Sequence, residues 1–292
     1  IRALSRVQGI VEKRSTNPII ANVLLEVGDD GMRVAATDTE VSFVGRYKVE
    51  VSRPGSLTLG ARQLYEIARL VPTQEVSFDL PEGSLQMEIS SGRSFFKVLG
   101  LAADEFPEVA EPNDLSGITL SSNNLKELID KTLFSISSDD TRTGLNGAHV
   151  EQWTDGEKSS LRFVATDGHR LSLCGRPFAG SLGKESNILL PKKGLAELRK
   201  LVDDGDGDWA VSLSDNQAIF QRNSMSFSMR LLEGDFPDYR QVVPGDWQRR
   251  LMVPRDTMIQ ALRRVSILAS EKSHPVRFAI EGGEVTVTAR QP

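Results

Sequence analysis

The sequence predicts an α+β fold made of tandem repeated domains, each with two helices packed on antiparallel sheets. Three kinds of segment occur twice: an Ala-Thr-Asp turn between two strands, an amphipathic helix, and a tetrapeptide of the form acid-Phe-Pro-acid. The matching pairs are residues 36–38 and 165–167, 61–71 and 192–202, and 105–108 and 235–238. All three pairs keep the same order and a separation of roughly 130 residues, which indicates a repeated structural unit.

The length of the chain bounds the number of domains. The chain has 292 residues, of which 39% are hydrophobic and 26% charged, a composition typical of soluble globular proteins with about two to three domains. Polar stretches that contain proline divide it into domains at 1–115, 116–245 and 246–292. By the logic of the repeat, the third domain holds only the first half of the pattern, and its C-terminal part is expected to be absent.

The first domain is expected to alternate one helix with three strands, twice over. The apolar stripe of its opening helix, residues 2–14, consists of Leu4, Val7, Ile10 and Val11. The remaining predicted elements are strands at 19–27, 32–36 and 40–51, a helix at 61–71, and strands at 76–80, 85–90 and 94–99.

The second domain repeats this pattern, and the third begins it. In the second domain we expect a helix at 123–133, strands at 148–153, 161–165 and 171–174, a helix at 192–202 and a strand at 209–213. In the third we expect a helix at 255–264 and strands at 276–280 and 285–289. The acidic stretch 203–208 resembles a calcium loop but lacks the later Glu and the following helix of an EF-hand, so an exposed turn is predicted.

Composition and motifs argue against several functional classes. No stretch approaches the roughly 18–20 apolar residues of a transmembrane helix. The single cysteine, Cys174, excludes an internal disulfide and is expected in the core. No metal-ligand spacing of His and Cys, no nucleophile elbow and no phosphate-binding loop is found, so no metal or cofactor is predicted. Thr166, Asp167 and His169 are interpreted as turn residues, and no enzyme is predicted.

The distribution of charge is uneven. The formal net charge is −5, yet the five predicted helices together carry a net positive charge, so the strands and loops are more acidic than the whole. If the helices share one surface, that surface is basic on an acidic body. We interpret this segregation of charge as functional, although basic residues scattered over solvated helix faces are common.

Four motifs, in this order along the chain, resemble the bacterial DNA polymerase III β subunit family, the sliding clamps. The motifs are residues 141–147 (Thr-Arg-Thr-Gly-Leu-Asn-Gly), 164–171 (Val-Ala-Thr-Asp-Gly-His-Arg-Leu), 191–194 (Pro-Lys-Lys-Gly) and 234–240 (Gly-Asp-Phe-Pro-Asp-Tyr-Arg). The resemblance covers essentially the whole chain. It implies the DNA-clamp fold, in which two subunits form a closed ring, head to tail, with helices lining the hole and sheets outside.

The resemblance also implies a function: a bacterial, cytoplasmic and nucleoid-associated processivity subunit that encircles duplex DNA without catalysis. The residues expected to face DNA are Lys13, Arg14, Arg62, Arg69, Lys126, Arg142, Lys192, Lys193, Arg199 and Lys200. The alternative is a repeat scaffold that binds peptides but no DNA. The basic helices favour the clamp, since a scaffold does not require charge to be separated by element.

Two further sets of residues follow from the resemblance. A pocket for short peptide motifs of the DNA polymerase III α subunit, the clamp loader, other polymerases and repair proteins is expected to be lined by Leu145, Thr166, Gly168, His169, Arg170, Leu171, Pro237 and Val242. Apolar side chains and a close-approaching glycine suit such an anchor site. The homodimer interface is expected to involve Phe106, Val109, Ile267 and Leu268.

Overall fold

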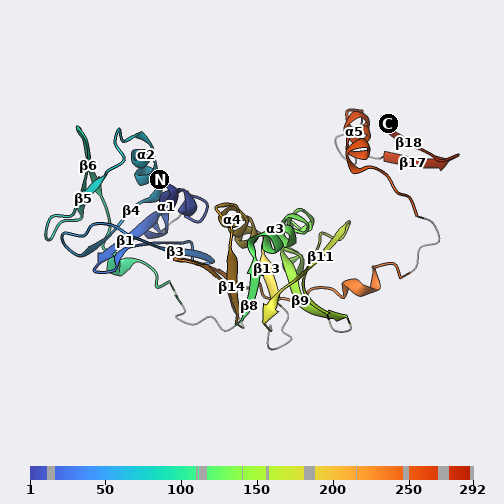
Figure 1. The fold of residues 1–292 in the computed structure, drawn as a ribbon, viewed down its shortest axis with the longest axis horizontal. Helices are drawn as coiled ribbons and strands as arrows, with labels where there is room; N and C mark the ends of the chain where they lie inside the picture. The colour runs from blue at the N-terminus through green and yellow to red at the C-terminus, as the bar shows by residue number, and fades with distance from the viewer. Residues whose placement is uncertain are drawn as a thin grey trace. The chain divides into compact units, whose positions relative to one another are not determined.

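Nine antiparallel strands form one sheet that runs through both copies of the repeated pattern (Figure 1). The computed structural model describes residues 1–11, 17–109, 111, 117–139, 141–155, 158–180, 188–214, 216–245, 250–268 and 276–289. They form two units, residues 1–237 and 238–292. Within the first unit, residues 1–111 are called the first repeat and residues 117–237 the second repeat.

The nine-stranded sheet joins the two repeats edge to edge. Its order is β12-β8-β14-β15-β16-β3-β2-β1-β4. Its strands are β1 (Asn22–Gly28), β2 (Gly31–Thr37), β3 (Val41–Tyr47), β4 (Gly55–Gly60), β8 (Ile118–Ser121), β12 (Ala179–Gly180), β14 (Asp208–Leu213), β15 (Gln217–Arg222) and β16 (Met225–Arg230). The junction is the ladder between β3 and β16, in register from Val41↔Met229 to Gly45↔Met225.

Two smaller antiparallel sheets complete the first unit. One has the order β5-β6-β7, with β5 (Ser77–Asp79), β6 (Gln86–Ser91) and β7 (Ser94–Leu99). The other has the order β11-β10-β9-β13, with β9 (Gly147–Asp155), β10 (Lys158–Thr166), β11 (Leu171–Pro177) and β13 (Ile188–Pro191).

The α-helices in the described part of the first unit lie along one side of these strands (Figure 1). They are α1 (Arg2–Val7), α2 (Ala61–Leu70), α3 (Ser122–Asp130) and α4 (Lys192–Asp203). Single turns of 3-10 helix are η1 (Pro18–Ala21), η2 (Ala103–Glu105), η3 (Leu133–Ser135) and η4 (Thr143–Leu145). One apolar core runs beneath the helices of both repeats and includes Val7, Phe43, Leu195 and Trp209. Burial of such side chains is the main stabilising contribution to the fold.

The described part of the second unit contains one α-helix and one β-hairpin. It holds η5 (Tyr239–Gln241), α5 (Arg255–Ser266) and a hairpin of β17 (Val276–Glu281) and β18 (Glu284–Ala289). The helix and both strands match the elements that the sequence predicts for the third domain.

The opening helix is shorter than predicted. The stripe Leu4, Val7, Ile10 and Val11 is buried as expected. However, α1 ends at Val7, because Gln8 and Gly9 turn the chain and Ile10 N donates to Val7 O at 3.0 Å. Gly9 lies so close to the Glu197 side chain that a Cβ there would overlap it. Residues 12–16 lie outside the described ranges.

Other boundaries also differ from the prediction. The strand expected at 19–27 begins only at Asn22, because Pro18 starts a 3-10 turn that the Asn17 side chain caps, accepting from Ile19 N at 3.2 Å. Proline fits the first turn of a helix, where its missing N–H is not needed. The strands β4, β15 and β16 were not predicted, although they complete the shared sheet.

Candidate partner surface and basic helix face

The turn between β10 and β11 is held by its own side chains. Thr166 Oγ1 donates to Arg170 O (2.7 Å) and accepts from Gly168 N (3.1 Å). Asp167 Oδ1 accepts from both His169 N and Arg170 N, each at 3.0 Å. Gly168 has a φ of +87°, a conformation that glycine adopts without a steric penalty. The turn is therefore rigid, and its backbone can be approached closely.

The turn between β2 and β3 has the same hydrogen bonds. Thr37 Oγ1 donates to Val41 O (3.1 Å) and accepts from Thr39 N (3.0 Å). Asp38 Oδ1 accepts from Glu40 N (2.9 Å) and Val41 N (2.7 Å). The two Ala-Thr-Asp segments that revealed the repeat in the sequence are thus the same structural turn.

Asp167 is the centre of the charge interactions in the β10–β11 turn. Hydrogen bonds from the backbone, first that of His169 and then that of Arg170, lower the pKa of the Asp167 carboxyl to about 2. Arg170 Nε donates to Asp167 Oδ2 at 2.9 Å, and the Arg170 guanidinium lies 5.5 Å from the centroid of the exposed Phe134 ring. The turn thus presents a cation and an aromatic ring side by side.

Several predicted pocket residues gather near the β10–β11 turn. Thr166 and Leu171 are paired across the hairpin, on the face opposite the core residues Val150 and Phe163. We call this face the outer face of the four-stranded sheet. Leu173, on the same face, is exposed.

A segment that follows β16 covers part of this outer face. Leu232 N donates to Leu189 O on β13 at 3.0 Å, and Phe236 stacks on His149 of β9. The backbone at Gly144, in η4, lies against Asp235, so that a Cβ on Gly144 would overlap Asp235 O. Leu145 and Pro237 directly follow Gly144 and Phe236 in the chain. Val242 belongs to the second unit, where it is exposed.

The corresponding face of the first repeat is filled. Ile19 and Ile20 from η1, Leu24 from β1, Ala35 from β2, Val44 from β3 and Phe106 form a buried apolar cluster there. Val44 is 2% exposed, whereas Leu173, which follows the second turn by the same number of residues, is 40% exposed. Among the residues that the structure describes, an open apolar surface therefore lies at the turn of the second repeat and not at that of the first.

Most of the described basic residues expected to face DNA have an acidic neighbour within the chain. Lys126 and Arg199 bind Asp203, Arg199 also binds Asp130, and Lys200 binds Glu197. Lys193 binds the buried carboxylate of Asp38. Longer contacts of 3.5–3.6 Å join Arg142 to Asp139 and Arg69 to Glu66.

The remaining candidates for DNA contact differ from this pattern. Lys192 Nζ donates to Ile136 O (3.0 Å) and Ser138 Oγ (2.6 Å), which ties α4 to the segment after η3. Arg62 is exposed, and no ion pair in the described part of the chain involves it. Lys13 and Arg14 lie outside the described residues.

The residues expected at the dimer interface lie in different environments. Ile267 and Leu268, just after α5, are 79% and 59% exposed. Phe106 is buried in the apolar cluster of the first repeat, and Val109 packs against the same cluster. Phe106 therefore offers little free surface, because its ring fills the space beneath η1.

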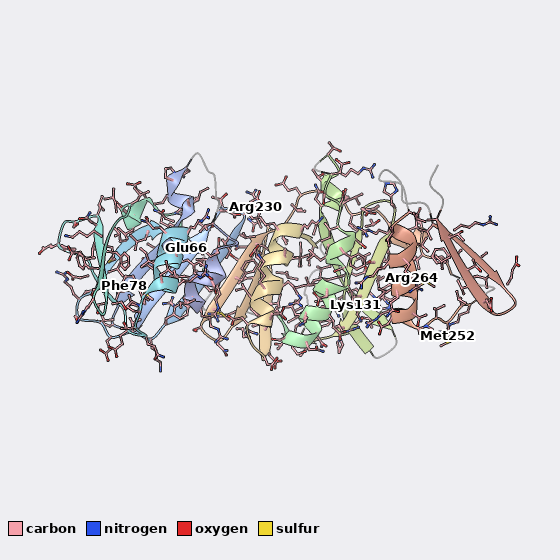
Figure 2. All side chains as sticks on the ribbon, turned by 90° about the horizontal axis from the view of Figure 1, so that it is seen from above. Glu66, Phe78, Lys131, Arg230, Met252 and Arg264 are labelled. Carbon is pink, nitrogen blue, oxygen red and sulfur yellow. The ribbon has the colours of Figure 1, made fainter. Side chains whose placement is uncertain are left out.

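An exposed apolar edge was missed by the sequence reasoning. Phe95 and Leu99 on β7 and Phe78 on β5 are exposed, and Figure 2 shows Phe78 at the periphery of the first repeat. Both β5 and β7 are edge strands of their sheet. The signal was present in residues 94–99, which are apolar on both faces of the strand and not on one alone.

Other kinds of site are absent from the described ranges. No group of three or more His, Cys, Asp or Glu side chains could hold a metal ion there. Every helix in those ranges is too short or too polar to cross a membrane. Cys174 is buried, as predicted, and burial raises the pKa of its thiol.

Tandem repeats of two helices on antiparallel strands, joined through one sheet, define a clamp-type fold. The family model for the DNA polymerase III beta subunit, N-terminal domain, matches residues 1–110, and that for the central domain matches residues 119–238. The beta sliding clamp of Caulobacter vibrioides (strain NA1000 / CB15N) is 34% identical over 291 residues, which covers 99% of this chain and 78% of that protein.

Further relatives agree with this match. The beta sliding clamp of Escherichia coli (strain K12) is 36% identical over 294 residues, covering 100% of this chain and 78% of that protein. The structure of a DnaN sliding clamp from Bartonella birtlesii bound to griselimycin superimposes with a TM-score of 0.92 at 34% identity, covering 100% of this chain and 78% of that one.

The chain belongs to the DNA polymerase III beta subunit family, the beta sliding clamps. This confirms the predicted clamp fold and the predicted function of a DNA sliding clamp over the alternative of a repeat scaffold. It also confirms that the chain is a non-catalytic processivity subunit and not an enzyme.

Proposed function

We propose that two copies of this chain form a ring that encircles duplex DNA in the bacterial cytoplasm, at the nucleoid, and tethers the replicative polymerase for processive synthesis. The helices lie along one side of the first unit, and the chain as a whole carries a charge of −5. Contacts between basic side chains and phosphates are independent of sequence and weakened by salt. Retention on DNA then depends on the closed ring and not on affinity.

The ion pairs on the helices fit this role. Arg199 and Lys200 are paired with Asp130, Asp203 and Glu197. They therefore contribute to the electrostatic potential of the helix surface without each binding a particular phosphate. Direct contacts are assigned to Arg62, which is exposed and has no ion pair in the described ranges, and to Arg69, whose contact with Glu66 is a longer one of 3.6 Å. Lys13 and Arg14 are kept as predicted contacts. A surface of this kind lets the ring slide, since no single contact holds it in place.

The open surface beside the β10–β11 turn is proposed as the partner pocket. The observation that carries this proposal is the contrast between the repeats: the same turn is surrounded by buried Ile19, Ile20 and Phe106 in the first repeat, but by exposed Leu173 and Phe134 in the second. Exposed apolar side chains beside a rigid, hydrogen-bonded turn are suited to anchor short apolar peptides.

The partners proposed for this pocket are short motifs of the DNA polymerase III α subunit, the clamp loader, other polymerases and repair proteins. For ring closure, we keep Ile267 and Leu268 of one subunit as one side of the interface. For the other side, β7 is proposed, because it carries the exposed Phe95 and Leu99 and is an edge strand of its sheet. Edge strands are prone to pair with another chain.

Loading onto a nicked circular duplex tests the ring. The clamp is loaded with a clamp loader and ATP, and the circle is then cut once. Loss of bound protein on linearisation, with retention before it, supports topological binding. Equal binding to circle and line that falls only with salt contradicts the ring and indicates an electrostatic DNA binder. If nothing is held, the ring proposal is overturned for this chain.

Binding of griselimycin, the compound held by the Bartonella birtlesii clamp in its solved structure, tests the pocket. Leu171→Asp places a charge on the proposed apolar wall and is expected to weaken binding at least tenfold. Val49→Asp is the matched control, because Val49 is exposed beyond the far end of β3 and should leave the affinity unchanged. Equal binding by wild type and Leu171→Asp would show that the pocket lies elsewhere.

A further inference from the structure

A histidine supports the segment that forms one wall of the proposed pocket. The rings of His149 and Phe236 are stacked, with centroids 5.2 Å apart and planes 11° apart. His149 lies on β9 and Phe236 directly precedes Pro237, one of the predicted wall residues. The stack is therefore a contact between the sheet and the base of the pocket wall.

In the first repeat, the position equivalent to His149 is held by Leu24. Leu24 pairs with Ala35 across β1 and β2, as His149 pairs with Val164 across β9 and β10. Ala35 and Val164 each precede the Ala-Thr-Asp aspartate of their repeat by three residues. Leu24 lies in the buried cluster with Phe106, the counterpart of Phe236. The second repeat thus has a flat polar ring where the first has an aliphatic side chain.

The surroundings of His149 fix the orientation of its ring. Its lateral neighbours Val164 and Leu189 are fully buried and apolar. Its Nε2 lies 3.9 Å from Glu151 Oε2, and the other oxygen of Glu151 lies 3.9 Å from Arg162 Nη1. Apolar contacts on two sides and a polar group at one edge hold the ring with its flat face towards Phe236.

We propose that His149 is a positioning residue of the partner pocket: its stacked ring holds Phe236, and through it Pro237, in the shape that receives a partner. This inference rests on the proposed pocket. A wall that is ordered before binding does not have to be ordered by the ligand, and such preorganisation raises affinity. An offset aromatic stack supplies this order beyond what apolar burial alone supplies.

Two variants separate stacking from packing. His149→Leu copies the first repeat and is expected to fold, but it removes the stack. It should weaken griselimycin binding by about threefold to tenfold, in line with the strength of aromatic pairs. His149→Phe restores a flat ring and should bind within about twofold of wild type. Hydrogen exchange of residues 231–237 is measured alongside, and it should be faster in His149→Leu alone.

Leu24→Ala is the matched control in the first repeat, because it loosens the contact with Phe106 and should leave griselimycin affinity unchanged. The inference is overturned if wild type binds and His149→Leu binds equally well, or if His149→Phe binds as weakly as His149→Leu. Failure of the proposed pocket gives a different pattern: wild type does not bind griselimycin, or Leu171→Asp binds as wild type does.

Discussion

Thr39 has the same place in its turn as Gly168, with a φ of +78° against +87°. Both follow the aspartate of an Ala-Thr-Asp segment, and the N–H of each donates to the preceding threonine hydroxyl. Glycine adopts this conformation freely, but for a β-branched residue it is strained. The first repeat therefore keeps the geometry of the turn at a cost that the second repeat avoids.

Replacing Thr39 with glycine should stabilise the protein. A non-glycine residue with a positive φ destabilises the folded state by about 1–2 kcal/mol. Against this, glycine makes the unfolded chain more flexible, which lowers the free energy of unfolding by about 0.5–1 kcal/mol. We expect Thr39→Gly to raise the free energy of unfolding by about 0.5–1 kcal/mol in urea titrations. Gly168→Ala should lower it by a similar amount or more, because its Cβ would lie 3.1 Å from Arg142 Nη1. A destabilised Thr39→Gly would contradict this account.

The repeat could be predicted from the sequence because its signals are local. The turns at 36–38 and 165–167 depend on side chains that bond their own backbone, and this chemistry is visible in a short window. The pairing of β3 with β16 depends on strands about 180 residues apart, and no local pattern specifies it. For the same reason β15 and β16 were missed, although both alternate buried and exposed residues in part.

The ion pair between Lys193 and Asp38 joins the two repeats. Its loss should lower the free energy of unfolding. The Asp38 side chain is 1% exposed, so without Lys193 a buried carboxylate keeps only its backbone donors. Lys193→Met is expected to cost about 1–2 kcal/mol of unfolding free energy.

Lys200→Met is the matched control for Lys193→Met. Lys200 is on the same helix, its side chain is 66% exposed, and it pairs with Glu197 three residues earlier. Because its ammonium is solvated, its loss should cost less than about 0.5 kcal/mol. Urea unfolding measures both variants. Equal, small losses would show that the contact with Asp38 does not hold the repeats together.

The predicted site residues fall into two groups: those of one contiguous motif, and those whose burial depends on segments distant in sequence. The binding roles of both groups stay predictions. Thr166, Gly168 and Leu171 lie at one exposed turn, as their motif implied. Phe106 was expected at an interface, but its burial depends on Ile19 and Leu24, which are distant in sequence. The roles of Lys193 and Arg199 likewise depend on acidic partners that only the fold brings near.

Asp167 should stabilise the protein in a pH-dependent way. Its pKa in the folded chain, about 2, lies below the value of about 3.9 for an unfolded aspartate. The contribution is thus complete above about pH 4 and is lost as the pH falls towards 2. Asp167→Asn should be less stable than wild type at pH 7, and the difference should shrink between pH 4 and pH 2.5. A difference that stays constant over this range would mean that the carboxylate charge is not involved.

Arg222 should be among the most sensitive residues of the second repeat. It is 4% exposed; its Nη2 donates to Leu201 O and its Nη1 to Ser122 Oγ, each at 3.0 Å, and Nη1 also donates to Gly205 O. It thus joins the end of α4 to the start of α3. Its guanidinium lies 4.5 Å from the centroid of the Trp209 ring, and burial lowers its pKa.

Arg222→Met keeps an apolar side chain against Trp209 but removes the guanidinium donors to Leu201 O, Gly205 O and Ser122 Oγ. Leu201 O then keeps only Asp204 N at 3.3 Å, and Gly205 O only Ser122 Oγ at 3.4 Å. A hydrogen bond to a charged group contributes about 1.5–3 kcal/mol, so the loss of several is expected to lower the free energy of unfolding by about 2–4 kcal/mol in urea unfolding followed by circular dichroism. Arg222→Lys should recover only part of the loss, because an ammonium cannot reach three acceptors in the planar geometry of a guanidinium. If lysine restored full stability, the charge and not the geometry of the donor would be what the site requires.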